Sequence, residues 1–320
     1  MPSVIEIAQS FRARLLRREA TALRAVVGAY MEAATAIKKR IDEMLAGGEL
    51  SENQVRVLAR LQSLERQIQV EITAFADLAA SAVIAAQADA VGLAIGQAAE
   101  ILSAFDRLPV RQIEAITSAF ERQALVGLFE DIGIGLSREA RRIFTSGIAQ
   151  GASASTVAKE LRDSLGIGMN RAMTISRTQI MTAYREANIE SYKAAGVTRY
   201  MWLASLSSRT CATCLALNGK TFDTDEPFAT HPRCRCTLIP VTDSIPRLQS
   251  GSAWLAGQDV ATQMDILGKS GYAAIQSGAV NLSDFVGEGR SAKFGPYRYQ
   301  KSLKEILGRD EAKRFYKRAV

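Results

Sequence analysis

All four cysteines of this chain and its only histidine lie in one short window, between residues 211 and 236 of 320. The window begins with Cys211-Ala-Thr-Cys214 and ends with His231-Pro-Arg-Cys234-Arg-Cys236. A C-x-x-C turn supplies two thiolates with little strain, and zinc takes nitrogen or sulfur ligands at four tetrahedral corners. The spacing therefore predicts a small module stapled by a structural Zn²⁺ inside a larger protein.

Two other interpretations of these cysteines are open. Free cysteines can be small buried hydrophobic residues, and pairs of them can form disulfides, although no secretory signal pattern opens the chain. Zinc explains better why no cysteine lies elsewhere. Five candidate ligands compete for four places, so Cys211, Cys214 and His231 are expected to bind with either Cys234 or Cys236, the other being spare.

The first third of the chain predicts long helices. From Val4 to Leu45, apolar residues recur at helical spacing with one glycine and no proline. Gly47-Gly48 indicates the end of this helix, and the capping-box pattern Ser51-Glu-Asn-Gln54 indicates the start of a second one. Two such helices joined by a tight turn form an antiparallel hairpin. The apolar stretch Leu78–Phe105 is interrupted by charged and amide residues, so no membrane span is predicted.

The middle of the chain predicts shorter helices, which glycines separate. They lie at Val110–Phe129, Arg138–Ala149, Thr156–Leu165 and Met169–Ala195. After them, alternating aromatic and branched residues predict strands at Thr198–Ala204 and Thr237–Val241.

The same region contains sequence signals for a turn and for an edge strand. Asn218-Gly219 predicts a hairpin turn inside the cysteine window, and Pro240 predicts that its strand lies at a sheet edge. Further on, short helices are predicted at Gln258–Gly268 and Gly271–Gln276, and Gly287–Pro296 is expected to be irregular.

The end of the chain is basic. From Glu288 onward, ten lysines and arginines against four acidic residues account for six of the seven net positive charges of the chain. Such a concentration favours a polyanion such as DNA as a partner, whereas the alternative is compensation of helix dipoles. The candidate nucleic-acid-binding residues are Arg298, Lys301, Lys304, Lys313, Arg314, Lys317 and Arg318.

These patterns predict a mainly α protein with a small zinc-stapled β and loop module. Its parts are a long N-terminal helical hairpin, an α+β central domain and short C-terminal helices. The expected boundaries are a hairpin over 1–108, a helical connector over 109–152, a central domain over 153–245 with the zinc module at 198–241, and a basic helical region over 246–320.

A series of motifs in the middle of the chain points to a known family. They are Arg171-Ala-Met-Thr-Ile-Ser-Arg-Thr178, Ala183-Tyr-Arg-Glu-Ala187, Trp202, Ser208-Arg-Thr-Cys-Ala-Thr-Cys214, Leu217-Asn-Gly-Lys220 and His231-Pro-Arg-Cys-Arg-Cys236. Together they resemble the phage Mu F-like minor head protein family, over about residues 154–241. One departure is Gln179, which stands where the family commonly has glutamate.

The resemblance implies a structural protein of a tailed phage or prophage. Members of the family are thought to associate with the portal, to help head assembly and to influence how DNA is packaged or ejected. The expected partner is therefore the portal protein, with scaffold, major capsid protein and packaged DNA as further candidates, and with no membrane and no small-molecule substrate. The expected location is the interior of the phage head, and the host cytoplasm during assembly.

The sequence offers no convincing catalytic set, so no enzyme is predicted. A zinc protease motif needs two histidines, and the deaminase motif needs a glutamate two residues after its histidine, where Arg233 stands. The alternatives are a zinc-dependent enzyme or toxin-related effector, including a Cys–His nucleophilic pair, and a non-specific DNA-binding protein.

Overall fold

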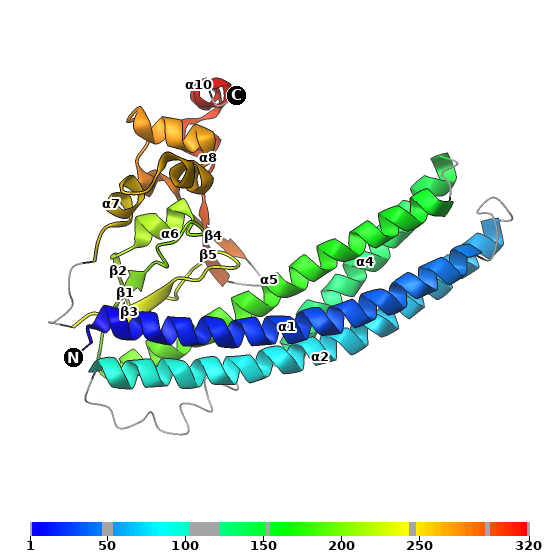
Figure 1. Ribbon diagram of the computed structural model, residues 1–320, viewed down its shortest axis with the longest axis horizontal. Helices are drawn as coiled ribbons and strands as arrows, with labels where there is room; N and C mark the ends of the chain where they lie inside the picture. Colours follow the sequence, from blue (N-terminus) through cyan, green and yellow to red (C-terminus); the bar gives the residue numbers. More distant parts are fainter. Residues whose placement is uncertain are drawn as a thin grey trace. The chain divides into compact units, whose positions relative to one another are not determined.

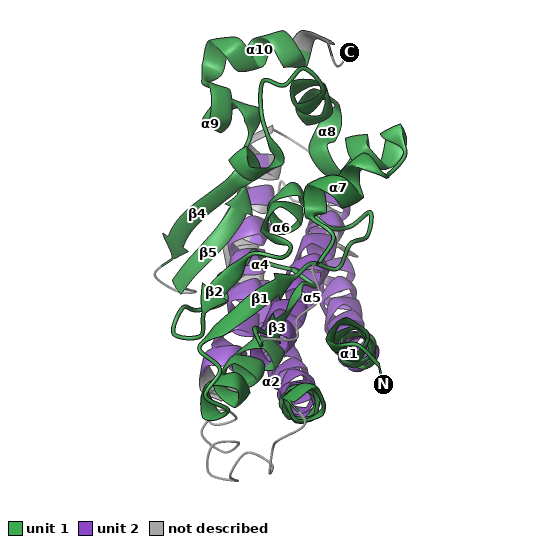
Figure 2. Ribbon diagram, turned by 90° about the vertical axis from the view of Figure 1, so that its left-hand side faces the viewer, with its two compact units in different colours: residues 1–14, 91–113, 184–320 green, residues 15–90, 114–183 purple. Residues whose placement is uncertain are grey.

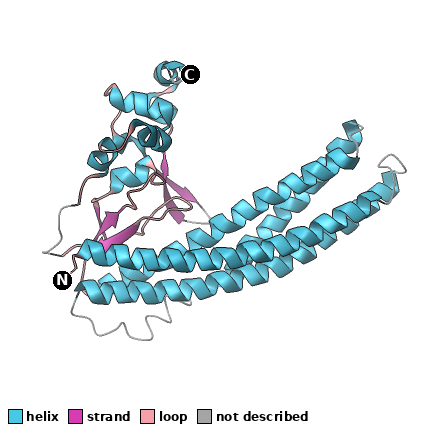
Figure 3. Ribbon diagram, in the orientation of Figure 1, coloured by secondary structure: helices cyan, strands magenta, loops and turns pink. Residues whose placement is uncertain are grey.

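The computed structural model describes residues 2–46, 54–102, 122–150, 154–242, 248–291 and 295–318. Most of them are helical (Figure 3), which confirms the mainly α prediction. The helices are α1 (Val4–Ala46), α2 (Gln54–Leu102), α4 (Arg122–Gln150), α5 (Ala154–Ala194), α6 (Ala212–Leu217), α7 (Gly251–Ala256), α8 (Val260–Gln276), α9 (Leu303–Leu307) and α10 (Arg309–Arg318), with one 3-10 turn, η1 (Leu282–Phe285) (Figure 1).

The strands form two small antiparallel sheets. They are β1 (Arg199–Leu203), β2 (Thr221–Asp223), β3 (Thr237–Pro240), β4 (Val286–Ser291) and β5 (Gly295–Gln300). The chain divides into two compact units (Figure 2): unit 1 comprises residues 1–14, 91–113 and 184–320, and unit 2 comprises 15–90 and 114–183. Both sheets belong to unit 1, whereas α1, α2 and α5 contribute residues to both units.

Unit 2 is a helical bundle built from segments of α1, α2, α4 and α5. The predicted helix from Val4 is confirmed, whereas the signals at Gly47-Gly48 and Ser51–Asn53 and much of Val110–Phe129 lie outside the described residues. The rings of Tyr30, Phe75 and Phe129 pack edge to face, with centroids 5.1 and 5.7 Å apart. Such aromatic contacts add to the stabilisation from burial.

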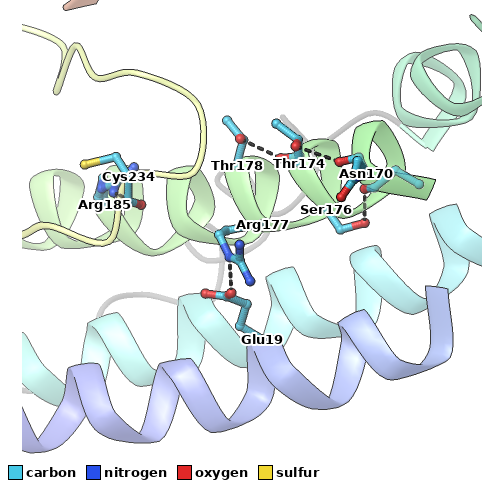
Figure 4. A network of polar contacts seen from close by, with 9 residues as sticks. Glu19, Asn170, Thr174, Ser176, Arg177, Thr178, Arg185 and Cys234 are labelled. Atoms are coloured by element: carbon cyan, nitrogen blue, oxygen red, sulfur yellow. Dashed lines mark hydrogen bonds and ion pairs between the residues drawn. The ribbon is translucent and has the colours of Figure 1, made fainter. Parts of the chain in front are cut away.

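A buried ion pair crosses this bundle. Arg177 of α5 donates through Nε to Oε1 of Glu19 on α1, and both side chains are largely shielded from solvent (Figure 4). Two residues further along α5, the carbonyl oxygen of Gln179 lies 3.5 Å from Nε2 of the buried Gln87 on α2. These polar contacts join three helices within a mostly apolar core, so they favour one register of the helices.

Two of the predicted helix boundaries are wrong. Helix α4 runs through Gly133, and α5 runs through Gly166 and Gly168, where the glycine spacing predicted separate helices. A Cβ on Gly133 would lie 2.5 Å from Cγ2 of Ile72, and one on Gly168 would lie 2.1 Å from the hydroxyl oxygen of Tyr30. These two glycines therefore allow close packing of helices instead of ending them.

Two of the glycines of α4 give a matched test of this packing. We expect Gly133→Ala to destabilise the protein by about 1–3 kcal/mol, because the added methyl group collides with Ile72. We expect Gly127→Ala, on the same helix, to stabilise it by about 0.5–1 kcal/mol, because nothing lies within 4 Å of its added methyl group. Urea unfolding of the two variants measures both changes, and equal effects would contradict the close contact.

The three-stranded sheet of unit 1 has the order β2-β1-β3. The predicted strands are confirmed, and Pro240 lies on an edge strand as expected, paired with Tyr200 of β1. Both faces of the sheet are covered. Tyr200 and Leu238 pack on Ile189 and Tyr192 of α5, whereas Leu203 and Ile239 pack on Ala8 of α1.

A buried polar network fixes this sheet on its helices. Nε2 of Gln97 on α2 lies within hydrogen-bond distance, 3.0–3.2 Å, of three acceptors that share its two hydrogens: Oδ1 of Asn188, the hydroxyl oxygen of Tyr192 and the carbonyl oxygen of Leu238. The hydroxyl of Tyr184 donates to Oε1 of the same glutamine. A buried network whose polar groups have hydrogen-bond partners fixes the position of β3 on α2 and α5.

Two turn predictions are corrected in unit 1. Asn218-Gly219 is not a hairpin turn: Asn218 caps the C-terminus of α6, and Gly219, with φ of 81°, leads into β2. In the segment Gly287–Pro296, expected to be irregular, residues 287–291 belong to β4 and 295–296 to β5, whereas 292–294 lie outside the described residues. The two strands pair antiparallel, with Gly287 opposite Tyr299 and Gly289 opposite Tyr297. The tyrosine rings cover the glycines, which compensates for the low strand propensity of glycine.

The C-terminal region, residues 248–318, otherwise follows the helical prediction. The predicted break near Gly268 is confirmed as a kink inside α8, where this glycine has φ of 71°. Within α2, the stretch Gln62–Leu102 is long and apolar enough to cross a membrane by length and composition, and half of its most apolar window is buried in the protein. Buried core helices pass the same test, so the absence of a membrane span stays a prediction.

Candidate metal centre

The first half of the cysteine window forms the start of α6. Cys211 is the N-cap residue, and its sulfur accepts a hydrogen bond from the backbone nitrogen of Cys214 at 3.5 Å. Residues three apart at a helix start lie on the same side. The short helix therefore presents two sulfur atoms together, as the C-x-x-C spacing predicts.

The second half is a tight turn before β3. The backbone nitrogen of Cys234 donates to the carbonyl oxygen of His231 at 3.3 Å, and Arg233 has φ of 64°. Strand β2 follows α6 in the chain, and β3 follows Cys236. Both strands pair with β1, so the sheet brings the two halves of the cysteine window together.

The structure thus gathers all five predicted ligands, here named the donor cluster: Cys211, Cys214, His231, Cys234 and Cys236. Their ligand atoms form two overlapping groups, each within 4.8 Å: Cys211, Cys214 and His231 in one, and Cys214, Cys234 and Cys236 in the other. Nε2 of His231 lies 3.3 Å from Sγ of Cys211 and 3.2 Å from Sγ of Cys214, and Sγ of Cys214 lies 3.7 Å from Sγ of Cys234. These groups could hold a metal ion.

The imidazole of His231 is oriented for this role. Its Nδ1 donates to the carbonyl oxygen of Pro232 at 2.8 Å. A hydrogen bond at one ring nitrogen of a ligating histidine fixes the tautomer and leaves the other nitrogen free to bind the metal. The free nitrogen, Nε2, is the one that faces the sulfur atoms of Cys211 and Cys214.

The thiols of Cys211, Cys214 and Cys234 divide into two kinds. The hydrogen bond with Cys214 lowers the pKa of Cys211 to about 5, and contact with Cys214 also holds the pKa of Cys234 well below its usual range. The same contacts raise the pKa of Cys214. Burial lowers the pKa of His231, but contacts with Cys211 and Cys234 raise it more, to about 11. Without metal the cluster therefore holds both thiolates and protons.

Acid is expected to weaken metal binding, because Cys214 and His231 must lose their protons before they can bind a metal. As the pH falls, protons compete more strongly for these ligands, so the apparent metal affinity should decrease. Competition with a chromophoric chelator at several pH values between about 6 and 8 measures this change. An affinity that is constant over this range would contradict the displacement of protons.

Arg185 of α5 supports the cluster from inside, although the sequence analysis assigned it no role. It is 2% exposed, and it donates from Nε to the carbonyl oxygen of Cys236 at 2.9 Å and from Nη2 to that of Cys234 at 2.7 Å (Figure 4). Its guanidinium lies 5.2 Å from the ring centroid of Phe228, which stacks on Trp202. One buried side chain thus fixes both ends of the Cys-x-Cys segment.

The predicted nucleic-acid-binding residues are not all on the surface. Arg298 is 9% exposed, and its Nε lies 3.1 Å from Oε1 of Glu288 while its guanidinium lies over the ring of Phe222. Lys301 is half-buried, whereas Lys304, Lys313 and Arg314 are exposed, and Lys313 pairs with Asp310. The side chains of Lys317 and Arg318 lie outside the described residues. A role of this region in DNA binding stays a prediction.

The comparison with known families agrees with the resemblance read from the motifs. Residues 139–239 match the family model described as Phage Mu protein F like protein. This segment contains the whole donor cluster and Arg185. Neither curated proteins nor solved structures give a significant match to the chain. Over residues 139–239 the chain is therefore similar to the phage Mu protein F-like family, and this similarity suggests a phage head morphogenesis protein.

Proposed function

We propose that this protein is a structural minor head protein of a tailed phage or prophage, which associates with the portal and acts in head assembly and in DNA packaging or ejection. The observation that carries the proposal is the Mu F-like domain at residues 139–239, because this family is structural and not enzymatic and implies association with the virion. The expected location is the head interior, after assembly in the host cytoplasm.

The donor cluster supports a structural zinc ion in this domain. Tetrahedral zinc with Zn–S of about 2.3 Å and Zn–N of about 2.0–2.1 Å has S···S edges of about 3.8 Å and S···N edges of about 3.5 Å. The observed separations are 3.7 Å for Cys214–Cys234 and 3.2–3.3 Å for His231 with the sulfurs of Cys214 and Cys211. These three separations match edges of a single tetrahedral site, and an ion bound there would hold α6 to the turn before β3.

The geometry favours Cys234 as the fourth ligand. Cys234 interacts with both Cys214 and His231, whereas the partners of Cys236 within the donor cluster are Cys214 and Cys234. A tetrahedral ion needs all four ligands at mutual contact distance. The ligand atoms of Cys211, Cys214 and His231 already form one such group, and Cys234 would complete the four by moving toward it. Cys236 would then pack beside the bound sulfur atoms as a thiol.

A pair of serine variants tests this assignment. We expect Cys234→Ser to lose bound zinc during purification, because only three strong ligands are left, and Cys236→Ser to retain about one zinc per chain. The two residues are equally buried, at 3% and 2% exposed, so the variants are matched in their packing cost. Metal analysis by plasma mass spectrometry measures the content. Loss of zinc in Cys236→Ser alone would reverse the assignment.

This ligand set also bears on the alternative of an enzyme. Catalytic zinc keeps one coordination position open for water or substrate. Three cysteines and the histidine fill all four positions in the proposed site, so the ion is assigned no catalytic role. The proposal likewise places no toxin activity on this domain.

The portal and virion parts of the proposal are tested in the phage that encodes the chain. We expect mass spectrometry of purified virions to detect the protein at a few copies per particle, and an affinity-tagged copy to recover the portal protein from assembly intermediates. Complementation of a deletion by wild type but not by Cys211→Ser would connect the metal centre to assembly. Absence of the protein from both virions and assembly intermediates would overturn the proposal.

A further inference from the structure

Helix α2 carries an exposed stripe of small and apolar side chains within unit 2. Its members recur every three or four residues, as along the seam of a coiled coil, and are here named the α2 stripe: Val70, Ala74, Leu78, Ser81, Ala85 and Ala88. Val70 is 68% exposed and Leu78 is 56% exposed. Apolar side chains that gather on one exposed face mark a surface that contacts another protein.

Helix α1 carries a second exposed stripe with the same spacing, here named the α1 stripe: Arg17, Thr21, Arg24, Gly28, Met31 and Thr35. Gly28 lies in the interior of a helix of 43 residues, where glycine is less stable than alanine. Nothing lies within 4 Å of a Cβ added at this position, so packing among the described residues does not require a glycine there. Gly28 leaves a gap on the surface near Met31, which is 52% exposed. A gap of this kind lets a second helix approach closely.

The two stripes differ in the sign of the charges around them. The exposed charged residues of α1 from residue 15 to 30 are all arginines, at positions 17, 18 and 24. The charged residues of α2 from residue 70 to 90 are all acidic, at positions 71, 77 and 89. Two α2 stripes in contact would bring carboxylates together, whereas an α1 stripe on an α2 stripe brings opposite charges together. The charges therefore favour contact between unlike stripes.

We propose that the α1 stripe of one copy packs antiparallel on the α2 stripe of a second copy of this chain. The gap at Gly28 then receives Leu78 of the second copy, as a knob enters a hole in a coiled coil. In this register Arg17 lies opposite Asp89, since each is 11 residues from the central pair, in opposite directions. Within one chain α1 and α2 also run antiparallel in unit 2 (Figure 1), and Arg18 lies 3.5 Å from Asp89. The two copies therefore stand at the same level along their helices.

The proposed contact joins two different surfaces. A pair of copies still has one free stripe of each kind, so association continues until it closes into a ring or extends as a filament. Neighbouring copies at the same level have no rise along the helices, which favours a ring. Both stripes lie outside residues 139–239, so this self-association depends neither on the donor cluster nor on the match to the family model.

Sedimentation velocity of the full-length protein tests the contact. We expect its mean mass to rise with concentration beyond that of a dimer. Gly28→Gln places a side chain in the gap and should weaken association by about tenfold or more. Glutamine favours a helix more than glycine does, so the dilute variant should unfold at the same or a higher urea concentration than dilute wild type. Misfolding would then not explain the weaker association.

A mixing experiment tests whether the two surfaces are different. Leu78→Arg places a positive charge in the α2 stripe, where it repels the arginines of the α1 stripe, so this variant alone should also be monomeric. Gly28→Gln keeps an intact α2 stripe, and Leu78→Arg keeps an intact α1 stripe. An equimolar mixture should therefore form dimers and nothing larger, because one contact remains and the other two surfaces are blocked. A mixture that stays monomeric would overturn the proposal.

Two variants on other helices of unit 2 serve as controls. Ile167→Arg changes an apolar residue of α5 that is 72% exposed, and Gly127→Ala adds a methyl group on α4 where nothing lies within 4 Å. Both should associate as wild type does. Equal loss of association in Ile167→Arg and Leu78→Arg, or a wild type that is monomeric at every concentration, would overturn the proposal. Association that requires added portal protein would assign the stripes to that partner and would overturn contact between copies.

Discussion

Cys214→Ser is expected to release the metal and to loosen the C-terminal region, residues 248–318, while the helical bundle of unit 2 stays folded. Cys214 is the residue that the two groups of candidate ligands share, so its loss removes more of the site than any other single change. Amide exchange in the C-terminal region should become faster by on the order of tenfold or more, since the binding free energy of a structural metal contributes directly to folding. Exchange in α4 should not change.

We expect the C-terminal region to depend on the metal because α6 contributes residues both to the donor cluster and to the core of that region. Cys211 and Cys214 on one side belong to the donor cluster, whereas Ala212 and Leu215 are buried in the core of the C-terminal region with Leu282 and other apolar residues. A Cβ on Gly251 would lie 1.9 Å from the carbonyl oxygen of Leu215, so α7 begins in direct contact with α6. A six-residue helix is not stable alone, and without metal this part of the core loses its support.

Hydrogen bonds also connect α6 to the C-terminal region. The hydroxyl of Thr213 lies 3.1 and 3.0 Å from the carbonyl oxygens of Phe285 and Tyr299, and the backbone nitrogen of Ala212 donates to Oε1 of Gln300. These bonds join α6 to η1 and to the β4-β5 hairpin. The metal would therefore act on elements that lie beyond residue 239, where the match to the family model ends.

Hydrogen–deuterium exchange followed by mass spectrometry measures the predicted change in amide exchange of the C-terminal region. Tryptophan fluorescence gives a second readout. The chain has two tryptophans: Trp202 packs with the cysteines, and Trp254 packs on the core of the C-terminal region. In a Trp202→Phe background, removal of metal by a chelator should shift the emission of Trp254 to the red. Unchanged exchange and emission in the metal-free protein would contradict the coupling.

Coupling between two sites is reciprocal, which provides a matched control. Leu303→Ala in the C-terminal core should weaken zinc affinity, whereas Leu125→Ala in unit 2 should not. Both leucines are 5% exposed, so the two variants lose similar amounts of packing. Equal zinc affinity of the two variants in chelator competition would argue against coupling through α6.

The donor cluster could be found from the sequence because its chemistry is local. The ligands lie in two short segments with spacings that a turn and a helix start impose. Arg185 carries no such signal, because it lies on a helix 26 residues before Cys211 and acts through backbone carbonyl groups. Two signs were available. Arg185 belongs to the motif Ala183-Tyr-Arg-Glu-Ala187, and it follows the buried Tyr184 in α5.

The glycines show why the helix boundaries were harder to predict. Gly268 has positive φ and breaks α8, as the local pattern suggests. Gly219 also has positive φ, but it follows the end of α6 and does not form the predicted hairpin turn. Gly133 and Gly168 have no such conformation and instead make room for Ile72 and Tyr30 from other helices. Which role a glycine takes depends on its neighbours in space, and a single sequence does not show them.

Arg185→Met is expected to lower the free energy of unfolding by about 3 kcal/mol and to weaken metal binding. Methionine fills a similar volume without a charge, but it leaves the buried carbonyl oxygens of Cys234 and Cys236 without their donor. Each unsatisfied buried acceptor costs about 1–3 kcal/mol. Arg185→Lys should lose less, because it keeps the positive charge, but a single ammonium does not reproduce the two parallel bonds.

Urea unfolding and chelator competition measure the two effects, and Arg14 offers a matched control. Its guanidinium lies 4.7 Å from the ring centroid of Phe11, as that of Arg185 lies over Phe228, yet Arg14 is exposed. An exposed cation–π contact is worth about 0.5–1 kcal/mol, so Arg14→Met should change stability by no more than that and leave zinc affinity intact. If Arg185→Met matched this small effect, the two carbonyl groups would not depend on Arg185, and the support of the cluster would have to come from the metal and the sheet alone.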